Sequence, residues 1–349
     1  MINFPKNIPF HLFATCIIVK GHNRSCIYDV QRGDYEYIPN SLADILNTSK
    51  GVTFEALTDS FNEQKDKDIL IDYFNFLLEK EFIFFSNLKS SFFPEYKTEF
   101  FRPYNISTLI IDLNYYDSEY LDIIKENINR AKVECLVIRF IDSGFDDILK
   151  VLQEFNDIST RTIHLFISKD TEFVRSKVND IFKTNNRISL IVKISDEEEY
   201  QENSERGVFI NLNEDIINNK FSYKEEAEFS PNLDLFMESK MFNSFHNKRV
   251  YINTIGGIFR YEGDNSNFGN IKNIDLMKVL VKPNFNKYWG ISKDNIEICN
   301  DCEFRYMCVD NRVPIEKNKD KVDFNLSSLF EFSTPCNYNP YTSEWNEPV

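Results

Sequence analysis

The 349-residue sequence lacks several features that would assign it to a common class of protein. No stretch approaches the roughly 18 uninterrupted apolar residues of a membrane-spanning helix, and the first residues, MINFPKNIPFHLF, have no basic segment ahead of an apolar one. We therefore expect no membrane partner and no secretory signal peptide. Basic residues are also scarce, since 40 Lys and Arg face 55 Asp and Glu, giving a net charge of −15. That balance argues against a nucleic-acid partner, because phosphate binding needs clustered basic side chains.

The motifs that mark common enzyme sites are missing as well. The sequence contains no G-x4-GK[ST] and no G-x-G-x2-G after a strand, so no nucleotide site is indicated. The four His are scattered, and no Ser, Cys or Asp pattern near them suggests a catalytic triad. Seven cysteines, an odd number without an export signal, favour a reducing cytoplasm over a disulfide framework. A hydrophobic content of 42% with 33 Phe and 17 Tyr indicates a folded protein.

Residues 1–95 have the pattern of a small module with three strands followed by three helices. Alternating apolar runs between turn residues predict strands at CIIVK, SCIYDV and DYEYIP. Periodic apolar residues predict helices at NSLADILN, TFEALTDSF and KDKDILIDYFNFLLEKEFIFF, the last running into an apolar tail. This order is typical of a winged helix. Its presumed recognition helix, TFEALTDSF, has acidic but no basic residues, so peptide binding is favoured over DNA binding.

Residues 96–245 follow a different pattern, after a linker punctuated by Pro94 and Pro103. Five short β-branched apolar runs alternate mostly with helical stretches: STLIIDL, ECLVIRFI, RTIHLFI, RISLIVKI and GVFINLN. Such runs predict a parallel sheet covered on both faces. We expect a partial (β/α) barrel, with a doubly wound sheet as the alternative. Arg139 is expected to pair with Asp112 or Asp142.

The alternation of strands and helices stops near residue 246. Within the preceding region, the acidic run DEEEYQENSE at 196–205 predicts a solvated connection. Beyond it, KRVYINTIGGIFRY predicts a hairpin turning at Gly256–Gly257, and we assign residues 246–349 to a C-terminal domain.

Four cysteines in this C-terminal region predict a metal site. Cys299, Cys302 and Cys308 have C-x2-C-x5-C spacing in a turn-rich segment, and Cys336 is the only other cysteine in the last 200 residues. Thiolates are soft ligands that select zinc or iron–sulfur clusters, and four of them complete the coordination of either. A complete site leaves no open position for substrate, so we expect a structural role and assign no catalytic residue. The alternative is four reduced cysteines without metal.

Several stretches resemble a known family. NTIGGIF, FGNI, YWGISKDNIEICNDCEFRYMC and CNYNPYTSEW resemble the SPASM domain, the auxiliary cluster domain of many radical SAM peptide-modifying enzymes. Together with FHLFATCIIVKGHNRSCIYDVQRGDYEYIPNSLADIL, the stretches CEFRYMC and NPYTSEW resemble the SPASM-domain peptide maturase of grasp-with-spasm systems. The resemblance is strong at both ends of the chain and weak in the middle. It implies a degenerate radical SAM-like partial barrel at 96–245 and a SPASM-like domain at 246–349.

The chain departs from this pattern at its metal sites. A complete SPASM domain binds two clusters, but Arg260 and Tyr261 stand where a hairpin cysteine is expected, and Asn311 replaces another. By this resemblance one cluster is absent and the second, a [4Fe–4S] cluster or alternatively a structural zinc, is retained at Cys299, Cys302, Cys308 and Cys336. The radical SAM motif C-x3-C-x2-C is missing, so we expect no S-adenosylmethionine and no radical SAM catalysis.

The N-terminal module is similar to the peptide-recognition element of peptide-maturation enzymes. In such elements a leader peptide adds as a strand beside the third strand and packs against the third helix, which is β-augmentation. The resemblance implies peptide contacts at the following residues, some of which must also serve as the module's core: Tyr35, Tyr37, Ile38, Ile69, Leu70, Tyr73, Phe74 and Leu77.

Taken together, the resemblance implies an accessory or recognition component of the maturation of ribosomally synthesised, post-translationally modified peptides. Its expected partners are the leader of a precursor peptide and an ATP-grasp ligase. One alternative is a peptide-modifying enzyme that uses the remaining cluster or an unseen site in the barrel. A weaker alternative is a DNA-binding regulator with a redox-sensing cluster.

Overall fold

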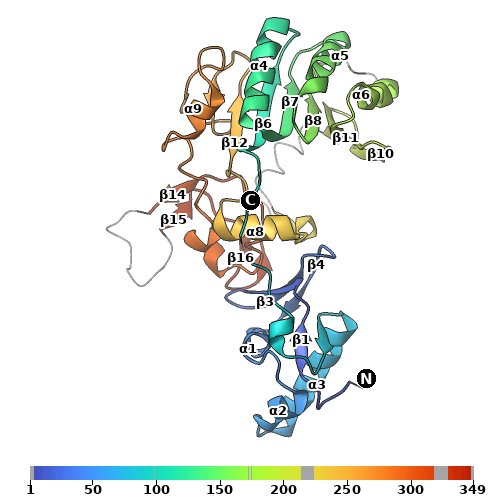
Figure 1. The fold of residues 1–349 in the computed structure, drawn as a ribbon, viewed down its shortest axis with the longest axis vertical. Coiled ribbons are helices and arrows are strands. Elements are labelled where there is room, and N and C mark those ends of the chain that lie inside the picture. Colours follow the sequence, from blue (N-terminus) through green and yellow to red (C-terminus); the bar gives the residue numbers. More distant parts are fainter. Residues whose placement is uncertain are drawn as a thin grey trace. The chain divides into compact units, whose positions relative to one another are not determined.

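The computed structural model describes residues 4–97, 99–171, 173, 175–213, 224–317 and 329–346. The chain forms two compact units, of which the first comprises Met1–Phe100, Lys224–Ser244 and Ile291–Val349 and the second Phe101–Tyr223 and Phe245–Gly290 (Figure 1). The boundaries of these units differ from those of the predicted domains 1–95, 96–245 and 246–349, because the second and third of these are each divided between both units. The first unit therefore combines the N-terminal module with most of the cysteine-rich end of the chain.

The N-terminal module contains the three strands and three helices predicted for it, flanked by one further short strand at each end. Its elements are β1 (Phe10–Leu12), β2 (Cys16–Lys20), β3 (Ser25–Asp29), β4 (Asp34–Ile38), α1 (Asn40–Thr48), α2 (Phe54–Asp59), α3 (Gln64–Glu79) and β5 (Ile83–Phe85). The strands β2, β3 and β4 form an antiparallel sheet in that order, and β1 pairs with β5.

The expected apolar tail of the third helix is the separate strand β5. The helix α3 stops because Glu81 adopts a left-handed conformation, with φ of 54°. The N–H of Glu81 donates to the carbonyl of Leu78 (3.0 Å), and that of Phe82 donates to the carbonyl of Leu77 (2.8 Å). These two bonds form a Schellman motif, which satisfies the last helical carbonyls and reverses the chain towards β1.

The other elements of the first unit are short. They are α8 (Leu233–Met241), β14 (Pro314–Glu316), β15 (Phe330–Phe332), β16 (Tyr338–Asn339), β17 (Glu344–Trp345) and the 3-10 turns η1 (Ser90–Phe92), η4 (Glu226–Glu228), η5 (Lys293–Asn295) and η6 (Cys299–Asp301).

The sheet β2–β3–β4 is buried on both faces, and every residue of β3 is buried. Because strand side chains alternate, Ile27 points to one face and Cys26 and Tyr28 to the other. The first face packs against the helices in a helix-side core of Ile27, Ile38, Leu42, Leu46, Phe54, Leu70, Phe74 and Leu77. The second packs in an aromatic core of Val19, Cys26, Tyr28, Phe229, Phe236, Phe304, Tyr306, Met307 and Tyr338.

The second unit is built on an eight-stranded, mostly parallel sheet, so the chain is a mixed α/β protein. Its elements are β6 (Ile106–Leu113), α4 (Ser118–Ala131), β7 (Val133–Phe140), α5 (Phe145–Glu154), η2 (Phe155–Asp157), β8 (Thr162–Ile167), η3 (Arg175–Lys177), α6 (Val178–Thr184), β9 (Ile188–Ser195), β10 (Tyr200–Asn203), β11 (Val208–Asn213), β12 (Arg249–Ile252), β13 (Ile258–Phe259) and α9 (Leu276–Leu280). The order in the sheet is β10-β11-β9-β8-β7-β6-β12-β13.

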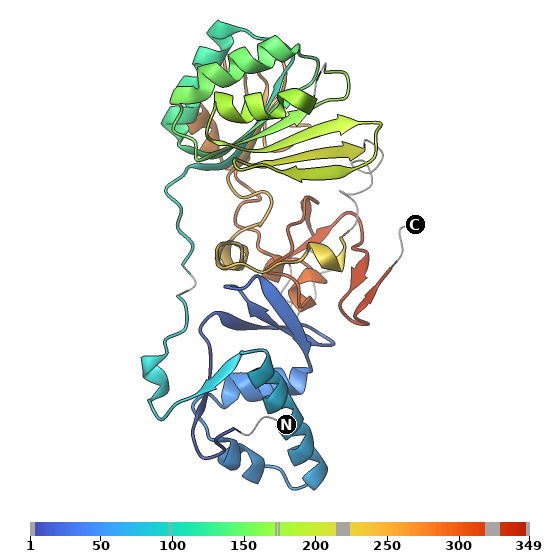
Figure 2. The same cartoon turned by 90° about the vertical axis from the view of Figure 1, so that its right-hand side faces the viewer.

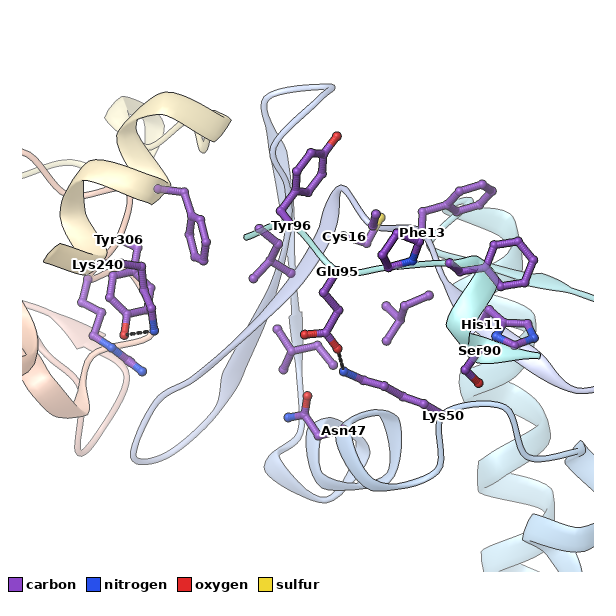
Figure 3. A pocket seen from close by; sticks show the side chains of 18 residues that line it. His11, Phe13, Cys16, Asn47, Lys50, Ser90, Glu95, Tyr96, Lys240 and Tyr306 are labelled. Carbon is purple, nitrogen blue, oxygen red and sulfur yellow. Dashed lines mark hydrogen bonds and ion pairs between the residues drawn. The ribbon is translucent and has the colours of Figure 1, made fainter. Parts of the chain in front are cut away.

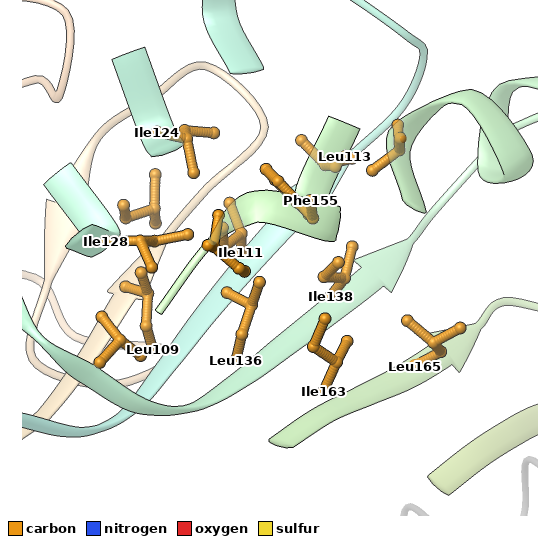
Figure 4. Packing of buried hydrophobic residues seen from close by; sticks show 14 of the residues in the cluster. Leu109, Ile111, Leu113, Ile124, Ile128, Leu136, Ile138, Phe155, Ile163 and Leu165 are labelled. Carbon is orange, nitrogen blue, oxygen red and sulfur yellow. The ribbon is translucent and has the colours of Figure 1, made fainter. Parts of the chain in front are cut away.

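The five apolar runs predicted as parallel strands are confirmed as β6, β7, β8, β9 and β11. They lie side by side in chain order, as in a barrel, whereas a doubly wound sheet reverses direction after its first strands. Helices α4, α5 and α6 all lie on one face of the sheet (Figure 2). This face carries the core of the unit, which includes Leu109, Ile111, Leu136, Ile138, Ile163 and Leu165 (Figure 4).

The expectation that helices cover both faces of this sheet is wrong for the described residues. Side chains on the opposite face are half-exposed, among them Thr108, Ile110, Phe166, Leu190, Ile194, Ile210 and Leu212. Helices fall on one face because successive right-handed crossovers that all advance in the same direction return over the same side.

One segment was assigned to the wrong element, and another belongs to a larger sheet than predicted. Tyr200–Asn203, within the predicted acidic connection, is strand β10 and pairs antiparallel with β11. The predicted hairpin near Gly256–Gly257 is present as β12 and β13, but β12 also extends the parallel sheet beside β6. Across the described ranges, no helix is both long and apolar enough to cross a bilayer.

Phe304 is the central ring of the aromatic core, and its replacement tests whether this core stabilises the first unit. Its ring lies 4.7 Å from that of Phe229 and 4.9 Å from that of Tyr338. We expect Phe304→Ala to lower the free energy of unfolding by about 3–5 kcal/mol, the usual cost of emptying a buried phenylalanine site. Urea denaturation followed by fluorescence would measure it. Phe92→Ala, at a side chain 65% exposed, is the matched control and should change stability little.

Candidate metal centre and peptide-binding edge

Three of the four predicted metal ligands lie in consecutive tight turns. Cys299 begins η6, directly after Ile298, whose φ of 68° reverses the chain. The N–H of Cys302 donates to the carbonyl of Cys299 (3.1 Å), and that of Cys308 to the carbonyl of Phe304 (3.0 Å). These turns keep the three thiols within one short segment at the edge of the aromatic core, where Cys302, Cys308 and Cys336 pack against its buried rings.

The thiols are close enough to influence one another's ionisation. Burial raises the pKa of Cys299 to about 12, and the negative charge of Cys308 adds to this shift. Burial also raises the pKa of Cys302 and of Cys308, with contributions from Cys299 for the first and Cys336 for the second. The four predicted ligands thus form one electrostatic group, and without a metal the three thiols are held protonated.

A buried cation that sequence reasoning missed lies beside these thiols. Lys293 is 5% exposed, and its Nζ lies 3.9 Å from a carboxylate oxygen of Asp310. Burial alone would lower the pKa of Lys293, but the charges of Cys308, Asp310 and Cys299 raise it. Arg312 forms a bidentate pair with the same Asp310, Nε to Oδ1 at 3.0 Å and Nη2 to Oδ2 at 2.5 Å. Asp310 and Arg312 flank Asn311, the position where the resembling family has a further cysteine.

The chemistry of this group fits a soft metal. Four thiolates around zinc or a cubane carry excess negative charge, which the buried ammonium of Lys293 would offset. The coordination geometry itself is not formed, because no three His, Cys, Asp or Glu side chains in the described ranges are arranged to hold a metal ion. The metal site therefore stays a prediction.

A polar cluster lies at the carboxyl ends of the central strands in the second unit. Arg139 on β7 donates to both carboxylate oxygens of Asp112 on β6 (2.5 and 2.7 Å), which confirms the predicted pair. The hydroxyl of Tyr251 on β12 donates to the same carboxylate (2.7 Å), and Glu262 pairs with Arg139 from the other side. Ligands of α/β proteins bind at this end of the sheet. Here, however, two carboxylates already neutralise the one guanidinium, so the cluster is not an anion site.

The strand β4 has an open edge whose backbone groups can be assigned from the hydrogen-bond pattern. The N–H of Gly21 donates to the carbonyl of Arg24 (3.0 Å), and that of Val30 to the carbonyl of Thr15 (3.0 Å). Because bonding alternates along an antiparallel pair, even-numbered residues of β3 bond to β2. The odd-numbered residues bond to β4, opposite Asp34, Glu36 and Ile38.

The backbone groups of Tyr35 and Tyr37 consequently point away from the sheet. No described strand pairs with β4 on that side. The N–H of Tyr35 is taken by Asp34 Oδ1 (2.8 Å), which leaves the Tyr35 carbonyl and both backbone groups of Tyr37 facing outwards. Their side chains are held in place on the aromatic-core face, where the hydroxyl of Tyr37 donates to Glu226 Oε1 (2.5 Å).

The other predicted peptide-binding residues divide into two sets. Ile38, Leu70, Phe74 and Leu77 are at most 2% exposed and belong to the helix-side core, so their side chains are not available to a peptide. Ile69, which is 38% exposed, and the half-exposed Tyr73 lie on the surface of α3. The end of that helix is tied to β4 by an ion pair between Lys80 and Glu36.

Comparisons with known proteins do not assign a family or a function to this chain. No protein-family model and no curated protein match the sequence. Among solved structures, the chain is similar to Streptococcus suis SuiB bound to S-adenosylmethionine, with 10% identity over 86% of this chain and 94% of that one, at a TM-score of 0.29. SuiB bound to precursor peptide SuiA gives 11% identity over the same shares and a TM-score of 0.33. TM-scores this low do not establish a common fold.

Removal of one thiol tests the four-cysteine site. We expect the anaerobically purified wild type to contain iron or zinc and Cys302→Ser to retain at least about tenfold less, since even outer-shell changes cost that much affinity. Elemental analysis would identify the metal, and visible absorbance would distinguish a [4Fe–4S] cluster from zinc. Cys135→Ser, at a half-buried thiol of the second unit, should leave the metal content unchanged. Equal metal in all three proteins would contradict the assignment.

Proposed function

We propose that the chain is an accessory component of peptide maturation, which binds the leader of a precursor peptide as an added strand along β4. The observation that carries this proposal is the outward-facing backbone of Tyr35 and Tyr37. An exposed edge of this kind supplies main-chain hydrogen bonds to any extended peptide, and neighbouring side chains supply the selectivity. Ile69 and Tyr73 on α3 are the apolar side chains available for that purpose.

The second part of the proposal is that the bound precursor is modified by another protein, an ATP-grasp ligase. Support comes from the sequence resemblance and from the absence of the radical SAM cysteine motif. The metal at Cys299, Cys302, Cys308 and Cys336, when bound, would stabilise the fold of the cysteine-rich segment, and the cysteines supply all its ligands. Lys293 would balance its charge.

A proline substitution at the β4 edge tests leader binding. Tyr37→Pro removes the outward N–H, and proline is tolerated on an edge strand whose N–H points to solvent. Tyr37→Ala loses the same phenol but keeps the N–H. We expect Tyr37→Pro to bind a labelled precursor leader about three- to tenfold more weakly than Tyr37→Ala, the worth of one backbone hydrogen bond. Fluorescence polarisation would measure the two affinities.

Mass spectrometry of the precursor after co-expression tests the accessory role. Loss of water from the precursor should require both this chain and the ligase, and should fall with Tyr37→Pro. A mass change produced by this chain alone would instead assign it a catalytic site of its own. Equal leader affinity for the two Tyr37 variants would rule out strand addition at β4.

A further inference from the structure

The first unit contains a groove of about 300 Å³ along β2, the opposite edge of the same three-stranded sheet. It is distinct from the β4 edge. One side is formed by β2 with the residues just before it, and the other by the segment after η1, α8 and the turn at Arg305 (Figure 3). We call it the β2 groove. Its lining includes Phe13, Ile18, Lys50, Glu95, Lys240 and Arg305.

The backbone of Ile18 faces this groove. The even-numbered residues of β3 bond to the odd-numbered residues of β2. The backbone groups of the even-numbered residues Cys16, Ile18 and Lys20 therefore point away from β3. Two of these are engaged already, because the N–H of Cys16 donates to the carbonyl of Phe13 (2.9 Å) and Arg305 Nη1 donates to the carbonyl of Lys20 (2.7 Å). Within the described ranges the N–H and carbonyl of Ile18 have no partner on that side. An extended segment could bond to both.

The charge of the groove is opposite to that of the chain. Three cations, Lys50, Lys240 and Arg305, line it with a single carboxylate, Glu95, although the chain as a whole carries −15. Two of these cations already have a carboxylate partner: Lys50 pairs with Glu95, and Arg305 Nε pairs with Asp294 Oδ1 outside the groove lining (3.0 Å). Lys240 donates only to a neutral group, the hydroxyl of Tyr306 (3.0 Å), and pairs with no carboxylate among the described residues. A half-buried ammonium of this kind favours an anionic ligand.

The linker shows how a carboxylate binds in this groove. Phe93 is anchored by ring contacts with His11 (4.7 Å) and Phe84 (4.9 Å). Two residues further on, the carboxylate of Glu95 pairs with Lys50. Both side chains are well exposed, 75% for Glu95 and 43% for Lys50, so this pair contributes little to stability and is readily exchanged.

We propose that the β2 groove binds an extended acidic segment of a peptide as a strand added to β2. The backbone of the segment bonds to Ile18, one carboxylate pairs with Lys240, and a second competes with Glu95 for Lys50. Its apolar side chains pack on Phe13 and Phe236. This site goes beyond the proposed function, because it does not depend on leader binding at β4.

The probe for this site is a fluorescein-labelled peptide of alternating valine and glutamate, about six residues long to span one strand. The full-length protein is titrated into it and the dissociation constant is read from fluorescence polarisation. A second probe, with glutamine in place of every glutamate, has the same length and strand propensity. We expect the glutamate probe to bind at least about tenfold more tightly, since it alone can form the ion pairs.

Three variants are expected to move this affinity in different directions. Lys240→Gln should weaken glutamate-probe binding about three- to tenfold, whereas Lys278→Gln, an exposed lysine of the second unit, should not. Glu95→Gln removes the internal competitor and should tighten binding about two- to fivefold. Ile18→Pro removes the outward N–H and should weaken binding relative to Ile18→Ala, which keeps it.

Equal binding of the two probes, or a Glu95→Gln protein that binds no more tightly than wild type, would overturn the proposal. So would self-association through β2, seen as a dimer in light scattering that Ile18→Pro converts to a monomer while the probe does not bind. Tyr37→Pro distinguishes the β2 groove from the β4 edge. It should leave binding of the glutamate probe unchanged even if it abolishes leader binding.

Discussion

The first unit depends on covering both faces of one small sheet. The strand β3 is buried along its whole length, and a strand in that position needs apolar partners above and below it. The helices α1, α2 and α3 supply one cover from nearby in the sequence. The other comes from around residue 304, and it is fastened by Arg24, whose Nε donates to the buried carboxylate of Glu303 (2.7 Å). Tyr28 adds a hydrogen bond from its hydroxyl to the Glu303 carbonyl (2.5 Å).

This arrangement gives the short stretch 299–308 two roles at once. Cys299 and Cys308 lie close enough to the buried Lys293 to raise its pKa, while Glu303 and Phe304, which lie between them in sequence, face the sheet. Arg305 then reaches the carbonyl of Lys20 at the end of β2. A metal that tightens the cysteine turns would therefore also fix the residues that hold the sheet. In this way the proposed metal site, although it has no open coordination position, would also affect the proposed peptide binding at the sheet's edges.

Local patterns in the sequence predicted the elements well, because alternation and helical periodicity are properties of neighbouring residues. The parallel strands β6 to β9 and β11, and the pair of Arg139 with Asp112, were accessible in this way. The placement of β12 was not, since a four-residue strand beside β6 is decided by contacts with residues about 140 positions away. The same limit applies to Tyr35 and Tyr37: their position on the third strand was predictable, but the anchoring of their side chains at Glu226 and Phe304 was not.

The candidate sites show a similar division. Cysteine spacing pointed to a metal group, but Lys293, Asp310 and Arg312 are ordinary charged residues whose burial depends on the folded turns around them. The β2 groove could not be predicted from the sequence, because its cations come from the turn after α1, from α8 and from the cysteine segment, which only the tertiary fold brings together.

The separation in sequence between Tyr28 and Phe304 also has a consequence during synthesis. The ribosome makes the whole of the second unit before it reaches Phe304, the central ring of the core on the aromatic face of β3. At translation rates of about 5–20 residues per second, that face waits on the order of 15 to 60 seconds for its partner. A nascent chain with the aromatic side of a strand uncovered for so long is a natural client for chaperones. Truncation before residue 304 would leave that surface permanently exposed.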